Sequence, residues 1–519
     1  MPRDFFQDRY AGLLVPLFSI PSRRSWGIGE LWDLPELAAW MSDAGFSFVQ
    51  LLPLNEMADG QNSPYSALSA MAIDPIFIAP AVVPDLEALG GEAVLSDAER
   101  RDLDAVRRAP AIDYARVRAL KTKALRAAFA HFLEHEWRAE TPRARRLRRF
   151  TERSRWWLDA YTLFRALHAR HDGRAWTDWE APLRDRDPAA LATLRTELAG
   201  EILFYAYLQW LAAEQWALAR DAAEIGVFGD FPFMVSRDSA DVWSRQEDFR
   251  MDASVGAPPD AFSETGQDWG FPAYRWDRIA ANGFQWLAAR ARRNAEIYDA
   301  CRVDHLVGFF RTYVRETDGR AGFVPADEPD QIRQGERVLE VLSAPGARLI
   351  AEDLGVIPAF VRETLLRLGI PGFKVLRWER EWEQEGRPFR RPADYPRVSV
   401  ATSGTHDTET NAQWWDEASI EERRAVAAIL GDGRCDPGAP FDDRVRDAIL
   451  DVLFASASDI ALVPIHDVFG WRERINTPAL ISDSNWTWRL PWPVEDLQTQ
   501  PEAAERAVYI RDLIARFRR

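Results

Sequence analysis

Short apolar runs recur along this chain, and stretches with helical periodicity separate most of them. A run of this kind, bounded by turn residues, is typical of a buried parallel strand. Eight such runs occur, at residues 12–20, 46–54, 225–235, 298–309, 348–354, 372–378, 398–405 and 460–465. Apolar residues at helical spacing predict helices between them, for instance over residues 34–44, 359–368 and 420–430. Eight alternating strand–helix units predict an α/β fold, the closed (β/α)8 or TIM barrel.

Two connections in this predicted barrel are longer than ordinary loops. About 170 residues separate the second strand from the third, and they contain long helical patterns over residues 95–136, 145–171 and 188–223. We therefore expect strands 1 and 2 in residues 1–58, a largely helical inserted subdomain in 59–215, and strands 3–8 in 216–519. The connection after the third strand, residues 236–295, begins with little predicted regular structure, and a long loop beside a barrel mouth is usually functional.

Composition and charge narrow the class of protein. The net charge of −16 argues against nucleic acid or an anionic membrane as the main partner. Cys301 and Cys435 form neither a disulfide framework nor a zinc motif. The first residues lack the apolar stretch of a signal peptide, and the apolar runs are too short for a transmembrane helix. We expect a cytoplasmic protein.

Tryptophan is abundant, with 22 residues. Large barrels bury many tryptophans, and this explanation is favoured for any single one. Sugar rings also pack their C–H faces on aromatic planes. Some tryptophans cluster near polar loop residues, which favours packing on sugar rings. These are Trp269, Trp414, Trp415, Trp486 and Trp488. By contrast, residues 379–397 are charged and contain proline, which predicts a solvated loop.

Three acidic phrases follow or close predicted strands. Asp304 would end strand four, Glu352 strand five and Asp407 strand seven. Active sites of such barrels lie at the carboxyl ends of the strands, so the three acids would converge on one rim. Glycosidic-bond chemistry needs one acid kept protonated and another kept ionised. The pattern therefore indicates a carbohydrate-active enzyme.

Asp304 is the candidate nucleophile, because Arg302 lies two residues earlier and projects to the same side of the strand. A neighbouring guanidinium favours the ionised carboxylate. The alternative is that Arg302 and Asp304 form a buried structural pair. Two further acids at matching strand ends argue against this alternative.

Glu352 is the candidate general acid and base, since apolar neighbours would keep it protonated. Its alternative role, or that of Asp353, is to cap the following helix.

Asp407 would be a third carboxylate that binds sugar hydroxyls as the ring flattens, and His406 would hydrogen-bond the same ring. A lone histidine is more often structural, but its place in Thr405-His406-Asp407-Thr408 favours a function. Three strand-end acids can also bind Mg²⁺. Arg302 and the histidines near the acids argue against a cation site, so we expect neither a metal nor an organic cofactor.

The chain resembles the 4-α-glucanotransferases, also called amylomaltases or disproportionating enzymes, of glycoside hydrolase family 77 in the α-amylase clan. Besides the acids, the resemblance covers Gly266-Gln267-Asp268-Trp269-Gly270 and further segments that extend from about residue 12 to residue 490. These segments are residues 25–30, 48–56, 63–66, 229–232, 258–263, 372–376 and 474–476.

This resemblance implies a role for each matching residue. Asp304 would be the nucleophile, Glu352 the acid/base and Asp407 the stabiliser of the transition state. Tyr65 would stack on the reacting sugar, and Arg302 and His406 would contact that sugar or the nucleophile. The groove for donor and acceptor would be lined by Asp230, Ser63, Gln267, Trp269 and Asn476.

The implied reaction transfers α-1,4-glucan segments between maltooligosaccharides with retention, through a covalent glucosyl-enzyme. The partners would be α-1,4-glucans and maltooligosaccharides, without nucleic acid or membrane, and the protein would be a monomer or a weak homo-oligomer. Three alternatives use the same barrel: an α-1,4-glucan hydrolase, a non-catalytic glucan-binding protein and a metal-dependent enzyme. The residues from 256 to 274 would form a lid over bound sugar.

Overall fold

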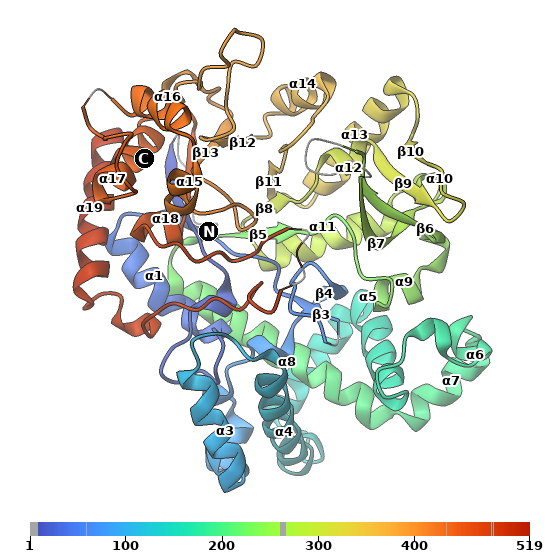
Figure 1. Ribbon diagram of the computed structural model, residues 1–519. Helices are drawn as coiled ribbons and strands as arrows, with labels where there is room; N and C mark the ends of the chain where they lie inside the picture. Colours follow the sequence, from blue (N-terminus) through green and yellow to red (C-terminus); the bar gives the residue numbers. More distant parts are fainter. Residues whose placement is uncertain (1–8, 59, 260–265, 432, 479, 481) are drawn as a thin grey trace.

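The computed structural model describes residues 9–58, 60–259, 266–431, 433–478, 480 and 482–519. Its centre is a closed barrel of eight parallel strands, as the sequence predicts (Figure 1). In chain order the barrel strands are β1 (Tyr10–Leu14), β2 (Phe48–Gln50), β5 (Gly226–Phe231), β8 (Ala300–Val303), β11 (Arg348–Ala351), β12 (Gly372–Val375), β13 (Ser399–Thr402) and β14 (Ile460–Pro464).

Seven of the eight apolar runs contain one of these strands, and the first run, residues 12–20, overlaps the end of β1; each strand is shorter than its run. Apolar residues continue beyond a strand end because the loops that follow are buried too. Leu51, Leu52 and Leu54 are buried after β2, and Leu306 and Phe309 after β8. The predicted helices agree closely with α1 (Leu34–Asp43), α14 (Ala359–Leu368) and α16 (Ile420–Leu430).

The long connection between β2 and β5 begins with a short antiparallel pair and continues almost entirely as helices. Figure 1 shows these helices below the barrel. The elements are β3 (Asn55–Met57), β4 (Ala67–Ile73), α2 (Pro84–Ala88), α3 (Asp97–Arg108), α4 (Tyr114–Phe132), α5 (Pro142–Arg170), α6 (Ala181–Arg184), α7 (Pro188–Glu197) and α8 (Ala199–Ala223). Helix α8 packs on α1 and α5, so it joins the insertion to the barrel.

The connection between β5 and β8 is more regular than the sequence indicated. It contains α9 (Ala240–Ser244), the antiparallel strands β6 (Phe249–Ala257) and β7 (Gln267–Tyr274), α10 (Trp276–Ala281) and α11 (Gln285–Ile297). Strands β6 and β7 join β9 (Thr312–Glu316) and β10 (Ala321–Val324) in a separate four-stranded sheet. The predicted lid is therefore largely a hairpin in a sheet rather than an irregular loop, and residues 260–265 lie outside the described part of the chain.

The remaining helices follow the later strands. They are α12 (Val307–Phe310), α13 (Glu328–Ser343), α15 (Asn411–Glu417), α17 (Asp443–Phe454), α18 (Ile465–Phe469) and α19 (Pro501–Phe517). The connection from β12 to β13 differs, because its one helical element is a 3-10 turn at Pro392–Asp394. No helix among the described residues is both long and apolar enough to cross a membrane.

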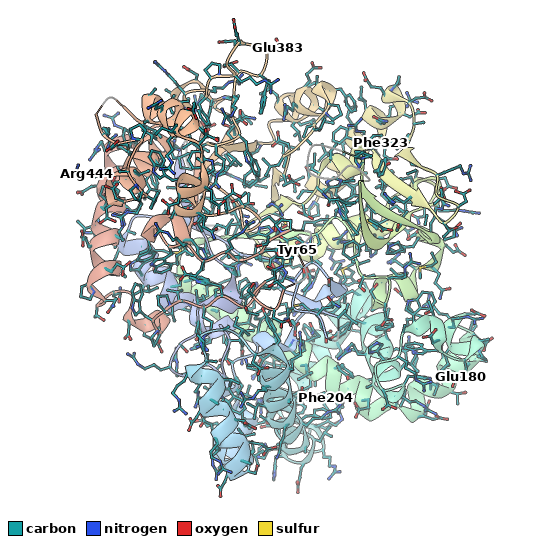
Figure 2. All side chains as sticks on the ribbon, in the orientation of Figure 1. Tyr65, Glu180, Phe204, Phe323, Glu383 and Arg444 are labelled. Carbon is teal, nitrogen blue, oxygen red and sulfur yellow. The ribbon has the colours of Figure 1, made fainter. Side chains whose placement is uncertain are left out.

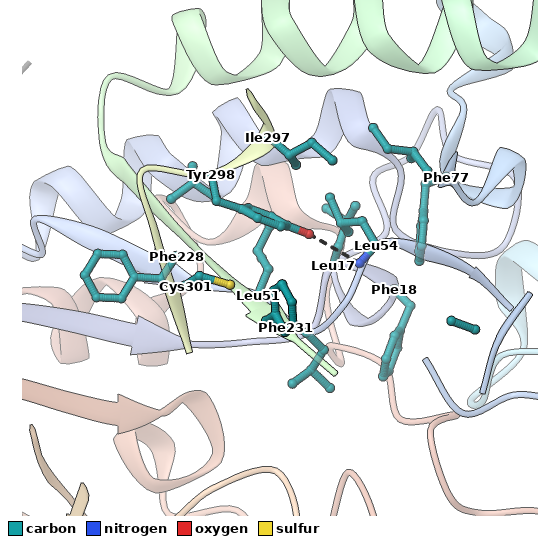
Figure 3. Close-up of a cluster of buried hydrophobic side chains, with 14 of the residues drawn as sticks. Leu17, Phe18, Leu51, Leu54, Phe77, Phe228, Phe231, Ile297, Tyr298 and Cys301 are labelled. Carbon is teal, nitrogen blue, oxygen red and sulfur yellow. Dashed lines mark hydrogen bonds between the residues drawn. The ribbon is translucent and has the colours of Figure 1, made fainter. Parts of the chain in front are cut away.

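Close packing around Tyr298 joins three neighbouring strands of the barrel. Tyr298 lies against β5, and a Cβ added at Gly229 would come within 2.2 Å of its ring, so only glycine fits there. The Tyr298 hydroxyl accepts a hydrogen bond from the Leu54 amide at 3.4 Å, in a cluster with Phe77 and Phe231 (Figure 3). These contacts join β2, β5 and β8 at one side of the barrel.

The chain beyond β14 returns to the mouth of the barrel and is held there by the insertion. The Tyr114 hydroxyl donates to the Trp486 carbonyl at 2.8 Å, and the Ile112 amide donates to the Thr487 carbonyl at 2.9 Å. The Arg489 guanidinium donates to carbonyls just after α3, at Ala109, and within it, at Val106. The insertion thus positions a segment that carries Trp486.

Candidate active site

A cavity of about 1690 Å³ opens at the carboxyl ends of the barrel strands. Asp304, Glu352 and Asp407 all line it. Asp304 directly follows β8 and Glu352 directly follows β11, whereas Asp407 lies five residues beyond the end of β13. The structure therefore brings the three predicted acids together on one rim.

Arg302 lies between two aspartates. Its Nη2 is 2.9 Å from Asp304 Oδ1, and its Nη1 is 2.9 and 2.7 Å from the two carboxylate oxygens of Asp230. Asp230 and Arg302 are partners in the register between β5 and β8, and both are buried. This paired, desolvated guanidinium fixes the Asp304 carboxylate at the cavity wall.

Asp230 also anchors an aromatic stack. The Tyr65 hydroxyl donates to Asp230 Oδ2 at 2.8 Å, and its ring stacks on the His406 ring with centroids 5.3 Å apart. Trp486 packs against both rings, at 5.8 Å from each. Tyr65 lies near the centre of the molecule in the view of Figure 2. Asp230 itself lies beneath the cavity, so its contact with the cavity runs through Tyr65 and Arg302.

Glu352 is half-buried and accepts two backbone hydrogen bonds. The His305 amide donates to Oε2 at 2.8 Å, and the Leu354 amide donates to Oε1 at 2.9 Å. Burial raises the pKa of Glu352 to about 7, with a further rise from the charge of Asp304, although Arg302 and the two amides oppose it. This carboxyl therefore exists in both protonation states near neutral pH.

His305 is a positioning residue to which the sequence assigned no role. Its φ of 43° lies in the left-handed region, which directs its amide to Glu352. Its ring packs edge-on against Trp269, with centroids 4.8 Å apart. Burial lowers the pKa of His305 to about 4, so the ring is neutral at neutral pH. A left-handed histidine has no sequence signature, so only the structure could reveal this link between Glu352 and β7.

Asp407 is held by its neighbours on two sides. His406 Nε2 lies 3.1 Å from Oδ2, and the Asn476 amide group donates to Oδ1 at 2.6 Å. Burial alone would raise the pKa of Asp407, but His406 and Asn476 lower it to about 2. Asp407 is therefore ionised at neutral pH, in contrast to Glu352.

The other predicted groove residues occupy different positions. Ser63, Gln267 and Trp269 line the cavity, and Trp269 Nε1 donates to Gln267 Oε1 at 3.0 Å. Trp414 and Trp486 also line it, whereas Trp415 is buried in the core and Trp488 packs on His466. The segment 258–263 continues into residues that lie outside the described part of the chain.

Asp353 has a structural contact that the sequence did not indicate. Its Oδ1 accepts a hydrogen bond from the Phe373 amide of β12 at 2.7 Å, while the residue that precedes α14 is Pro358. Neither Asp353 nor Glu352 caps that helix. Within the described part of the chain, no group of three or more His, Cys, Asp or Glu is placed to hold a metal ion.

Comparison with known proteins agrees with this geometry. A model of the 4-α-glucanotransferases, glycoside hydrolase family 77, matches residues 15–495. The chain belongs to this family. The 4-α-glucanotransferase of Thermus thermophilus is 34% identical over 537 residues, which cover 98% of this chain and 99% of that protein. The Chlamydia pneumoniae 4-α-glucanotransferase is 33% identical over 504 residues, covering 94% of this chain and 92% of the relative.

A solved structure extends the match to the whole 4-α-glucanotransferase fold. The amylomaltase from Streptococcus agalactiae, in complex with acarbose, superposes with a TM-score of 0.83 at 26% identity. The superposition covers 98% of this chain and 99% of that one. The chain is therefore an enzyme with 4-α-glucanotransferase activity, built on a closed barrel of eight parallel strands.

Proposed function

We propose that the three acids of this enzyme transfer α-1,4-glucan segments between maltooligosaccharides by a retaining double displacement. The observation that supports this best is the contrast between two acids in one cavity. Glu352 has a pKa raised to about 7, while Asp407 is held ionised with a pKa of about 2. Retaining glycosidic chemistry needs such a division between carboxyl groups.

In the first step, an Asp304 carboxylate oxygen attacks the anomeric carbon of the donor glucan. The bond between that carbon and the leaving 4-oxygen breaks, and Glu352 gives its proton to the oxygen. A β-linked glucosyl ester with Asp304 forms. Arg302, paired with both Asp230 and Asp304, keeps the attacking oxygen in place. Asp407 and His406 would bind hydroxyls of the flattened ring, and Tyr65 would stack on it.

In the second step, the now ionised Glu352 takes the proton from the 4-hydroxyl of an incoming glucan. That oxygen attacks the anomeric carbon, and the ester to Asp304 breaks. Two inversions give net retention and a new α-1,4 bond. Transfer must outcompete water at about 55 M, so the acceptor has to be bound in register. Trp269, whose ring packs on His305, and Gln267, which accepts a hydrogen bond from Trp269, would hold the acceptor.

Products from maltotriose test this proposal. Transfer should give glucose together with maltotetraose, maltopentaose and longer chains, because each cleavage passes a segment to another maltotriose. Chromatography of the oligosaccharides at early times would detect this series. Glucose and maltose alone would indicate a hydrolase and defeat the proposed transfer.

The pH dependence of the first step follows from Glu352. Its raised pKa of about 7 means that the acid form predominates below pH 7 and is lost above it. We therefore expect kcat/KM for maltotriose to fall about tenfold for each pH unit well above 7, and Asp407 to impose no limit above about pH 3. Initial rates in overlapping buffers would measure this. A constant kcat/KM up to pH 9 would remove Glu352 from the role of acid.

We also propose a cytoplasmic location, a monomer or weak homo-oligomer and the division into residues 1–58, 59–215 and 216–519. The two free cysteines, Cys301 and Cys435, support a reducing compartment. The helical content between β4 and β5 supports the division, with α8 as the join between insertion and barrel.

A further inference from the structure

Asp407 differs from the other two acids in what sets its position. Asp304 and Glu352 each directly follow a barrel strand, so the barrel itself places them. Asp407 lies in the middle of residues 403–411, which we call the Asp407 loop and which run from the end of β13 into the first residue of α15. Both ends of such a loop must be held, because a displacement of about 1 Å can lower a rate about 100-fold.

Arg377 bridges the two ends of the Asp407 loop. It follows β12, the neighbour of β13 in the barrel, and its side chain is buried. Nη2 donates to the Ser403 carbonyl at 2.8 Å and to Asn411 Oδ1 at 3.2 Å. Nη1 donates to the Glu409 carbonyl at 2.7 Å and to the carboxylate Oε1 of the same residue at 2.9 Å. One planar guanidinium group therefore binds the beginning and the end of the loop at once.

Asp467 bridges the same two ends from the opposite side. It lies in α18, which follows β14, the other neighbour of β13. Its Oδ2 accepts a hydrogen bond from the Ser403 hydroxyl, and its Oδ1 accepts one from the Asn411 backbone amide at 2.8 Å. Burial raises the pKa of Asp467, and the charge of Arg377 opposes that rise. The loop is thus closed by one charged side chain from beyond each of the two neighbouring strands.

Contacts within the loop connect these ends to Asp407. A Cβ added at Gly404 would come within 3.2 Å of Arg377 Nη2, so the guanidinium packs directly on the loop backbone. Thr405 Oγ1 accepts a hydrogen bond from the Asp407 amide at 3.2 Å, and Thr408 Oγ1 accepts one from the Thr405 amide at 3.0 Å. A shift of either end would therefore move Asp407.

We propose that Arg377 and Asp467 are positioning residues, which act on the reaction by holding Asp407 against the reacting sugar. The proposal rests on the proposed function of Asp407. The sequence assigned no role to either residue, because their contacts depend on three neighbouring strands that end at the same rim. Since Asp407 would bind the flattened ring more strongly than the resting sugar, a displaced Asp407 should lower kcat more than it raises KM.

Arg377→Lys tests the bridge. The lysine keeps the positive charge, but its one nitrogen cannot bond both ends of the loop. We expect kcat with maltotriose to fall about 10- to 100-fold, and KM to change less than about threefold. Arg293→Lys is the matched control and should keep the kcat of the parent enzyme. Arg293 is also buried, donates to the Met71 carbonyl at 2.8 Å and pairs with Glu296, but it does not line the cavity.

A double-mutant cycle shows whether Arg377 acts through Asp407. The initial release of fluoride from α-maltosyl fluoride reports formation of the ester, whether the ester then passes to a glucan or to water. This measurement therefore stands even if the enzyme is a hydrolase. Arg377→Lys should lower the rate of fluoride release in the parent enzyme about 10- to 100-fold, but less than about threefold in the Asp407→Asn variant.

A kcat of Arg377→Lys within about twofold of that of the parent enzyme would overturn the proposal. So would the same loss of fluoride release with and without the Asp407 carboxylate, or an equal fall of kcat in Arg293→Lys. If Arg377→Lys does not fold, Asn411→Ala decides, because it removes one contact of Arg377 and keeps the backbone amide that binds Asp467. Its kcat should fall at least about threefold, and a kcat equal to that of the parent enzyme would reject the bridge.

Discussion

Replacing Asp304 by alanine should reduce the rate of glucan transfer by at least about 10⁴-fold, because the covalent intermediate can no longer form. Fold stability should change little. Arg302 keeps its two contacts with Asp230 when Asp304 is removed, so no buried charge is left without a partner. Initial rates of glucose release from maltotriose would measure the loss.

Asp304→Asn is the matched variant, since it keeps the volume and removes the nucleophilic charge. Both variants should show circular dichroism and a melting temperature close to those of the parent enzyme, and both should still bind maltooligosaccharide. Turnover within tenfold of the parent enzyme would reject Asp304 as the nucleophile. It would then favour a different carboxyl group or a protein whose glucan binding is not catalytic.

Replacing Glu352 by glutamine should lower transfer by about 10²–10⁴-fold, the usual contribution of a general acid and base. The amide keeps the size of the side chain, and its oxygen can still accept from the His305 or Leu354 amide. The fall of kcat/KM above pH 7 should disappear with the carboxyl group. Rates at pH 5–9 with maltotriose would test both expectations.

A donor with a fluoride leaving group separates the two roles of Glu352. Fluoride leaves without a proton, so the Glu352→Gln variant should form the maltosyl ester of Asp304 from α-maltosyl fluoride at a rate close to that of the parent enzyme. It should then accumulate the ester, because the acceptor lacks a base. Equal losses with the fluoride and with maltotriose would show that Glu352 acts on binding rather than on proton transfer.

The sequence predicted the barrel well because strand burial leaves a strong pattern. It missed strand β6, because its partner strand β7 lacks the alternating pattern. Residues 249–257 alternate apolar and polar side chains, which is the strand pattern, but Gly270 and Pro272 in β7 interrupt the matching run of the partner strand. A hairpin is hard to recognise when only one of its two strands has the pattern.

The acids could be predicted because each follows a recognisable strand. Their surroundings could not. The contact of Arg302 with Asp230 depends on the register between β5 and β8, and the amide bond to Glu352 depends on the left-handed backbone at His305. Residue types alone specify neither the register between two strands nor the backbone φ angle of a single residue. The sequence therefore supplies the reacting groups, whereas the arrangement that tunes them comes from the neighbouring strands and loops.

The insertion binds the segment around Trp486 through hydrogen bonds, and this determines when the active site is completed during synthesis of the chain. A nascent chain that has emerged as far as Pro464 contains all eight strands and all three acids, yet it lacks both Asn476 and Trp486. Asp407 then has no amide partner, and Tyr65 has one side of its stack open. The site is therefore complete only after Trp486 has been made, when α3 and α4, synthesised long before, bind the returning segment.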